Sequence, residues 1–88
     1  MPVYVGVRYV AEARESTALE QADRIGAAAL RLAQDGSPVK LLSTTFVPNE
    51  EWVFDVFEAL SADEVKHVYA VSGIPVERVT EGVHRAGP

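Results

Sequence analysis

The apolar residues of this chain recur at two different spacings, one typical of strands and the other typical of helices. From Val3 to Val10 the side chains alternate at every second residue, which is typical of a half-buried β-strand. From Thr17 to Gln34 apolar residues recur every three or four positions, which predicts an amphipathic helix. The predicted elements, in chain order, are strand 3–10, helix 17–34, strand 39–47, strand 51–60, helix 61–72 and strand 76–84.

Start and stop signals delimit both helices. Thr17 to Glu20 and Ser61 to Glu64 each fit a capping box, in which a hydroxyl accepts an unpaired backbone N–H of the first helical turn. Gly36 and Gly73 are typical of left-handed helix ends, and a proline follows each within two residues. The residues expected to form the buried stripe of the first helix are Leu19, Ala22, Ile25, Ala29 and Leu32 or Ala33. Those of the second are Val65, Val68 and Tyr69.

The element order β-α-β-β-α-β predicts an α+β, ferredoxin-like fold. Residues 48–50 join two strands through a short turn, so we expect these strands to pair as an antiparallel hairpin. The expected architecture is a four-stranded antiparallel sheet with two helices on one face. We treat residues 1–88 as a single domain, with residues 84–88 as a frayed tail.

The predicted sheet has large apolar residues on both faces. Trp52, Phe54 and Val56 point to one face of the third strand, and Val53 and Phe57 point to the other. Two helices cover only one face, and a chain of 88 residues buries little surface by itself. We therefore predict a homodimer in which two sheets pack through their second faces to form a dimeric α+β barrel.

The overall charge and composition exclude several functional classes. The net charge is −5 with no basic stripe, which disfavours a nucleic-acid partner. There is no cysteine, no export signal and no apolar run long enough for a membrane span, so a cytoplasmic protein without a membrane partner is expected. Neither a phosphate-binding loop nor a dinucleotide fingerprint is present, and no cofactor is predicted.

The position of Asp55 is not explained by the residue preferences of β-strands. It lies in the middle of an apolar strand, where a buried carboxylate must be paired or protonated. One interpretation is a pocket acid or base, with Arg8 and Tyr69 as the accompanying catalytic residues that orient a substrate. The other is a structural pair of Asp55 with Arg8, Arg78 or a strand hydroxyl. Alternation alone does not say to which face Asp55 points.

Five further residues are candidates for contacts with a small-molecule ligand. Tyr4 shares a face of the first strand with Arg8, and Glu58 shares a face of the third strand with Phe54. The candidate ligand-binding residues are Tyr4, Trp52, Phe54, Glu58 and His67. Each also has a structural interpretation as a core, strand-end or surface residue. His67 and His84 are the only histidines and have no metal-ligand spacing, so no metal site is predicted.

Over residues 51–82 the chain resembles a small bacterial family of ferredoxin-like proteins often labelled nickel-binding. The matching stretches are Glu58–Ser61, Glu64–Val65 and Ser72–Pro75. The resemblance implies the same fold, a dimer and a bacterial origin. It also implies histidines at four positions where this chain has Arg8, Tyr9, Tyr69 and Ile74, so the metal label is not expected to transfer.

Three functions follow as hypotheses. The first is a cofactor-independent isomerase or cyclase that acts by proton transfer on a small, largely apolar organic molecule held between sheet and helices. The second is a non-catalytic metabolite-binding or assembly module that uses the same pocket. The third is a nickel or other divalent metal-binding protein, as in the resembling family.

Overall fold

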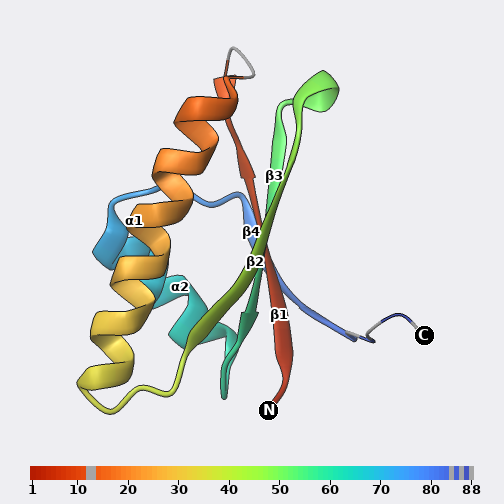
Figure 1. Ribbon diagram of the computed structural model, residues 1–88. Helices are drawn as coiled ribbons and strands as arrows, with labels where there is room; N and C mark the ends of the chain where they lie inside the picture. Colours follow the sequence, from red (N-terminus) through yellow and green to blue (C-terminus); the bar gives the residue numbers. More distant parts are fainter. Residues whose placement is uncertain (12–13, 84, 86, 88) are drawn as a thin grey trace.

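The computed structural model describes residues 1–11, 14–83, 85 and 87 and contains the six predicted elements together with a short 3₁₀ turn between β2 and β3 (Figure 1). The elements are β1 (Val3–Tyr9), α1 (Glu15–Gln34), β2 (Lys40–Val47), η2 (Pro48–Glu50), β3 (Trp52–Glu58), α2 (Ala62–Ser72) and β4 (Arg78–Gly82).

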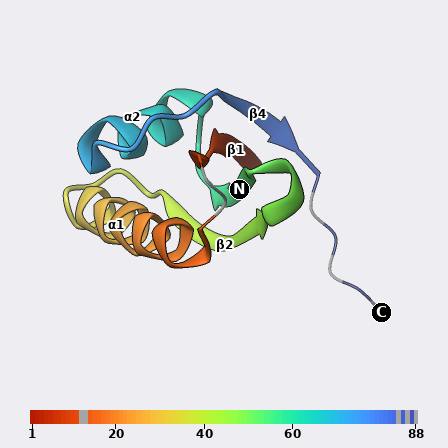
Figure 2. The ribbon, with the colours of Figure 1, turned by 90° about the horizontal axis from the view of Figure 1, so that it is seen from above.

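The four strands form one antiparallel sheet in the order β2-β3-β1-β4. β2 and β3 pair as the predicted hairpin. Both α1 and α2 lie on the same face of the sheet, so neither of them covers the opposite face (Figures 1 and 2). The predicted ferredoxin-like α+β fold is confirmed. We call the face without helices the open face.

The start of α1 differs from its prediction. The helix begins at Glu15, two residues before the predicted Thr17, and its N-cap residue Arg14 makes no side-chain capping bond. The buried stripe contains Ile25, Ala29 and Leu32 as predicted. At its start, Ala18 is fully buried whereas Leu19 is 51% exposed. The small methyl group of Ala18 brings this end of α1 close to the sheet. The predicted burial of Leu19 is therefore wrong.

The ends of α2 agree with their sequence signals. The Ser61 hydroxyl accepts the Glu64 backbone N–H at 3.3 Å, and the Glu64 carboxylate accepts the Leu60 N–H at 2.7 Å. Gly73 ends the helix in the left-handed conformation with φ 73°, where a side chain would be strained. α2 is therefore fixed in position at both ends, which determines where its buried side chains lie.

The main core lies between the helices and the sheet. Its large side chains include six from β1, α1, β3 and α2, namely Tyr4, Ile25, Phe57, Val65, Val68 and Tyr69. Phe57 and Tyr69 meet edge to face with ring centroids 5.6 Å apart. β4 is shorter than predicted, and the predicted frayed tail falls largely on residues 84, 86 and 88, which lie outside the described residues.

Candidate functional site

Asp55 points to the face of the sheet that the helices cover. In the sheet register it lies opposite Gly6 of β1 on one side and Thr44 of β2 on the other. Its side chain is 0% exposed. Burial of an unpaired carboxylate costs roughly several kcal/mol of folding free energy. Asp55 must therefore have strong partners.

Arg8 is the main partner of Asp55. Its Nε donates to Asp55 Oδ2 at 2.7 Å and its Nη2 donates to Oδ1 at 3.3 Å, so the ion pair has two points of contact. The remaining donors of the guanidinium reach α1. Nη1 donates to Gln21 Oε1 at 2.6 Å and Nη2 donates to the Ala18 carbonyl at 3.3 Å. Arg8 therefore ties β3 to the start of α1.

Two hydroxyl groups complete the coordination of Asp55. Tyr69 donates to Oδ2 at 2.7 Å from α2, and Thr44 donates to Oδ1 at 2.8 Å from β2. Burial, followed by the charge of Asp55 and the hydrogen bond to it, raises the pKa of Tyr69 far above its ordinary value. Tyr69 is therefore a neutral donor at physiological pH. We call Arg8, Gln21, Thr44, Asp55 and Tyr69 the polar network.

The polar network is closed and internally satisfied. Each carboxylate oxygen of Asp55 accepts two hydrogen bonds. Within the described part of the chain, no buried side-chain nitrogen or oxygen lacks a partner. A saturated carboxylate held by a buried guanidinium is poorly placed to take a proton from a substrate. Its hydrogen bonds, together with those of Arg8, join three strands and two helices.

Sequence reasoning foresaw most of the polar network. Arg8, Asp55 and Tyr69 were predicted to lie together and do so, and the strand hydroxyl proposed as a structural partner of Asp55 is that of Thr44. Gln21 was missed. The available signal was its spacing, because Gln21 follows the buried Ala18 by three residues and precedes the buried Ile25 by four.

The five predicted ligand-binding residues do not converge on one site. Tyr4 is part of the main core beneath the helices. Trp52, Phe54 and Glu58 lie on the open face, and His67 is exposed on α2. Trp52 packs edge to face against Tyr9 of β1, with ring centroids 5.7 Å apart. Only the residues of β3 therefore share a surface.

A pocket of about 470 Å³ lies on the open face and contains two of the predicted ligand residues. Trp52 and Phe54 line it together with Val7, and three charged residues border the same space, namely Glu50, Glu77 and Arg78. We call this space the open-face pocket. It combines apolar side chains with charged groups, as small-molecule sites commonly do.

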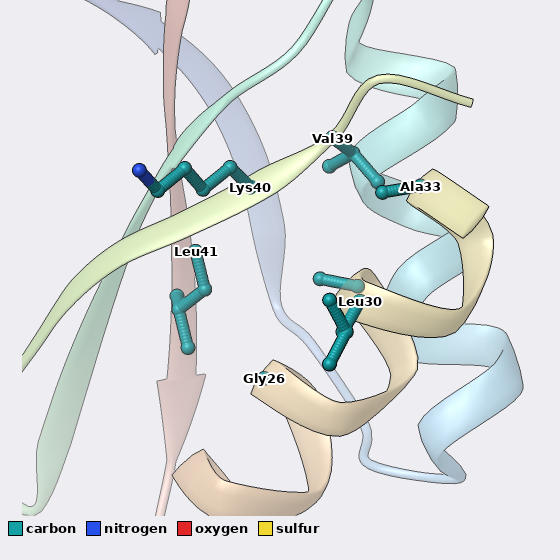
Figure 3. A pocket seen from close by; sticks show the side chains of 7 residues that line it. Gly26, Leu30, Ala33, Val39, Lys40 and Leu41 are labelled. Carbon is teal, nitrogen blue, oxygen red and sulfur yellow. The ribbon is translucent and has the colours of Figure 1, made fainter. Parts of the chain in front are cut away.

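A second pocket lies between α1 and β2. It has a volume of about 390 Å³ and is lined by Gly26, Ala29, Leu30, Ala33, Val39, Lys40 and Leu41. Figure 3 shows that the Lys40 side chain runs away from α1, so its ammonium group does not face Leu30 or Ala33. This pocket involves only one helix and the edge of the sheet, and none of the predicted site residues lines it.

Neither a metal cluster nor a membrane span emerges from the described residues. Across residues 1–11, 14–83, 85 and 87, no group of three or more acidic or histidine side chains is arranged to hold a metal ion. His67 is exposed, and His84 lies outside the described residues. In the same ranges, neither helix is long and apolar enough to cross a bilayer.

Comparison with known proteins identifies the fold class. No protein-family model matches the sequence, and no curated protein matches it. The structure is similar to that of SCO4226 from Streptomyces coelicolor A3(2), with a TM-score of 0.73 and 21% sequence identity. The alignment covers 96% of this chain and 99% of SCO4226. At this identity the similarity shows that the two proteins share a small ferredoxin-like α+β fold.

Proposed function

We propose that this protein binds a small, largely apolar organic molecule in the open-face pocket, as one half of a homodimeric α+β barrel. The observation that carries the proposal is the separation of two sites. The polar network is sealed beneath the helices, whereas the pocket lined by Trp52 and Phe54 opens on the other face. Binding without catalysis by Asp55 is the function that this arrangement supports best.

The chemistry of the open face supports a ligand with an apolar body. Val7, Trp52 and Phe54 supply apolar and aromatic surface to a space of about 470 Å³, which is within the usual size range for small-molecule sites, roughly 300–1,000 Å³. Burial of one aromatic ring there would contribute about 1.5–3 kcal/mol. The charged residues at its border would fix the orientation of the ligand.

The same face supports the homodimer. Val3 and Val5 of β1 and Val56 of β3 are only partly buried, and Val5 lies opposite Val56 in the sheet register. They alternate along their strands with residues of the face that the helices cover, so they belong to the open face. A contiguous apolar sheet face is a common protein interface. A second copy packed on it would bury these valines and enclose the pocket between two sheets.

Proton-transfer catalysis is the competing function. A cofactor-independent isomerase or cyclase would need Asp55 in contact with substrate, yet Arg8, Thr44 and Tyr69 occupy its oxygens. Turnover would require the helices to separate from the sheet and break an ion pair with two contacts. The three hydrogen-bonded partners of Asp55 instead favour the structural interpretation. Metal binding, the third hypothesis, gains no support from the described side chains.

The binding test uses the single tryptophan of the chain, Trp52, as a fluorescent reporter inside the pocket. Titration with 2-phenylethanol, a neutral aromatic probe, should change the Trp52 emission in a saturable way. Phe54→Ala should weaken binding about 10-fold or more, as the loss of a ring contact implies. Leu30→Ala, which changes the pocket between α1 and β2, is the matched control and should bind normally. No saturable change in the wild type, with this probe or with charged probes of the same phenylethyl body, would refute the proposal.

Sedimentation equilibrium tests the homodimer. A dimer has a mass of about 19 kDa, twice the 9.5 kDa of one chain. Val56→Glu places a charge at the centre of the open face and should give the monomer mass. Leu30→Glu introduces the same charge at a residue that is 62% exposed on α1, and this control should remain dimeric. A wild-type monomer at high concentration would exclude the barrel.

A further inference from the structure

We propose that the open-face pocket selects ligands that carry a protonated amine beside an aromatic ring. This inference rests on the proposed function and names the chemical class of the ligand. Three independent features of the pocket lead to it: the balance of charge at its border, the aromatic side chains that line it, and the fixed backbone of the residues that carry the charges.

The charge balance at the border favours a cation. Two carboxylates, from Glu50 and Glu77, and one guanidinium, from Arg78, line the pocket, so the local charge is −2 + 1 = −1. No ion pair within 4.0 Å joins these three residues to each other or to another described side chain. The whole chain carries −5, which adds to the attraction. A ligand with a single positive charge would neutralise the border.

The aromatic lining strengthens the preference for a cation. Indole and phenyl faces attract an ammonium group within about 6 Å of the ring centroid, and indole does so best. Trp52 is held in place by its edge-to-face contact with Tyr9. A ligand ring can also stack on or pack against Trp52 and Phe54. The same two side chains therefore contribute to binding of both parts of an aromatic amine.

The backbone positions of the two carboxylates are fixed by the fold. Glu50 ends the 3₁₀ turn η2, which is closed by the Glu51 N–H donating to the Pro48 carbonyl at 3.2 Å. Glu77 precedes β4 and its N–H donates to the Val7 carbonyl at 2.8 Å. Val7 itself lines the pocket. Both acidic residues thus project from ordered backbone, which reduces the entropy lost when a cation binds.

Arg78 distinguishes an amine from a zwitterion. If the ligand were an amino acid, its carboxylate would pair with Arg78, and removal of the guanidinium would weaken binding. If the ligand is a simple amine, the guanidinium of Arg78 only repels its positive charge, so removal of the guanidinium strengthens binding. Because the border carries one more carboxylate than guanidinium, we commit to the simple amine.

The experiment compares three probes with the same phenylethyl body: phenethylamine, 2-phenylethanol and 3-phenylpropionate. Affinities come from Trp52 fluorescence and calorimetry at low salt on the full chain. We expect phenethylamine to bind roughly 5-fold or more tightly than the alcohol, since two exposed ion pairs contribute. Glu50→Gln and Glu77→Gln should each weaken only the amine, by roughly 2- to 5-fold. Glu20→Gln, which removes the same charge from the exposed face of α1, should change nothing.

Each result has one meaning. Arg78→Gln should strengthen binding of phenethylamine by roughly 2- to 5-fold, while Arg31→Gln on α1 has no effect. Equal affinities for the amine and the alcohol would refute the amine preference and leave the proposed binding function intact. Tightest binding of 3-phenylpropionate, lost in Arg78→Gln, would refute it in favour of an anion. Binding of none of the three probes would refute the proposed function itself.

Discussion

Gly6 lies directly beneath the hydroxyl group of Tyr69. A Cβ atom at Gly6 would overlap the Tyr69 hydroxyl oxygen and lie 2.6 Å from Cζ. Only a residue without a side chain lets the Tyr69 hydroxyl reach Asp55, which Gly6 faces in the sheet register. The alternating pattern of β1 gave Gly6 no particular role. The polar network nevertheless requires a glycine at this position.

Gly6→Ala should destabilise the protein. The methyl group would displace Tyr69 and break its hydrogen bond to Asp55, so we expect a loss of about 2–4 kcal/mol in the free energy of unfolding, from overpacking and a lost buried donor. Chemical denaturation checks this value. Gly26→Ala is the matched control, because its Cβ would lie at an ordinary 3.6 Å from Leu41 and should stabilise α1 by up to about 1 kcal/mol. Equal stability of the two variants would contradict the role of Gly6.

Asp55→Asn should destabilise the protein through its partner. The amide carries no charge, so the buried guanidinium of Arg8 would lose its counter-ion, at a cost of about 3–5 kcal/mol. The measurement is denaturant unfolding at neutral pH. Replacement of both residues, as in Arg8→Met with Asp55→Leu, should recover part of the loss, because no unpaired charge is then left inside. If Asp55→Asn were as stable as the wild type, the ion pair would contribute little to the fold.

Because of Glu64, we expect the stability of the protein to depend on pH in the acidic range. The hydrogen bond from the Ser37 hydroxyl, at 2.6 Å, is the main cause that lowers the pKa of Glu64 below its ordinary 4.5, with help from backbone N–H groups at the start of α2. A carboxyl group with a lowered pKa in the folded state stabilises the fold above its unfolded pKa. That contribution is lost as the pH falls through the folded value.

The corresponding test compares the wild type with Glu64→Gln across acidic pH. The wild type should be more stable above about pH 4.5, the ordinary pKa of the free group, and its advantage should shrink steadily below that pH. Thermal unfolding at a series of pH values measures the difference. Glu20→Gln on the exposed face of α1 provides the control. If the difference in stability between the wild type and Glu64→Gln stayed constant from neutral to strongly acidic pH, the charge of Glu64 would not contribute to the stability of the fold.

The fold could be predicted from the sequence because its signals are local. The period of two in β1 and the Ser61 and Gly73 ends of α2 each depend on neighbouring residues, and the structure reproduces them. The predicted start of α1 was wrong. Thr17 matches a capping box, but the helix begins earlier, at Glu15. A short motif does not show where packing against the sheet lets the helix begin.

The site could be predicted only in part because its contacts join distant segments. Asp55 and Arg8 were recognisable as charges within apolar strands, but the face to which Asp55 points depends on pairing with both Gly6 and Thr44. Trp52 and Phe54 were proposed as ligand candidates, and both line the open-face pocket. The acidic residues beside them were not, because Glu50 and Glu77 lie outside the strands and reach the pocket only through the folded turns.

The most direct measurement compares Tyr69→Phe with Phe54→Ala for binding of 2-phenylethanol. Tyr69→Phe removes one donor from the polar network and should reduce the free energy of unfolding by about 1–3 kcal/mol, yet leave the affinity for the probe unchanged. Phe54→Ala should weaken binding about 10-fold or more through the loss of its ring from the open-face pocket. The opposite result, with affinity lost in folded Tyr69→Phe and kept in Phe54→Ala, would place the ligand site at the polar network and contradict the proposal.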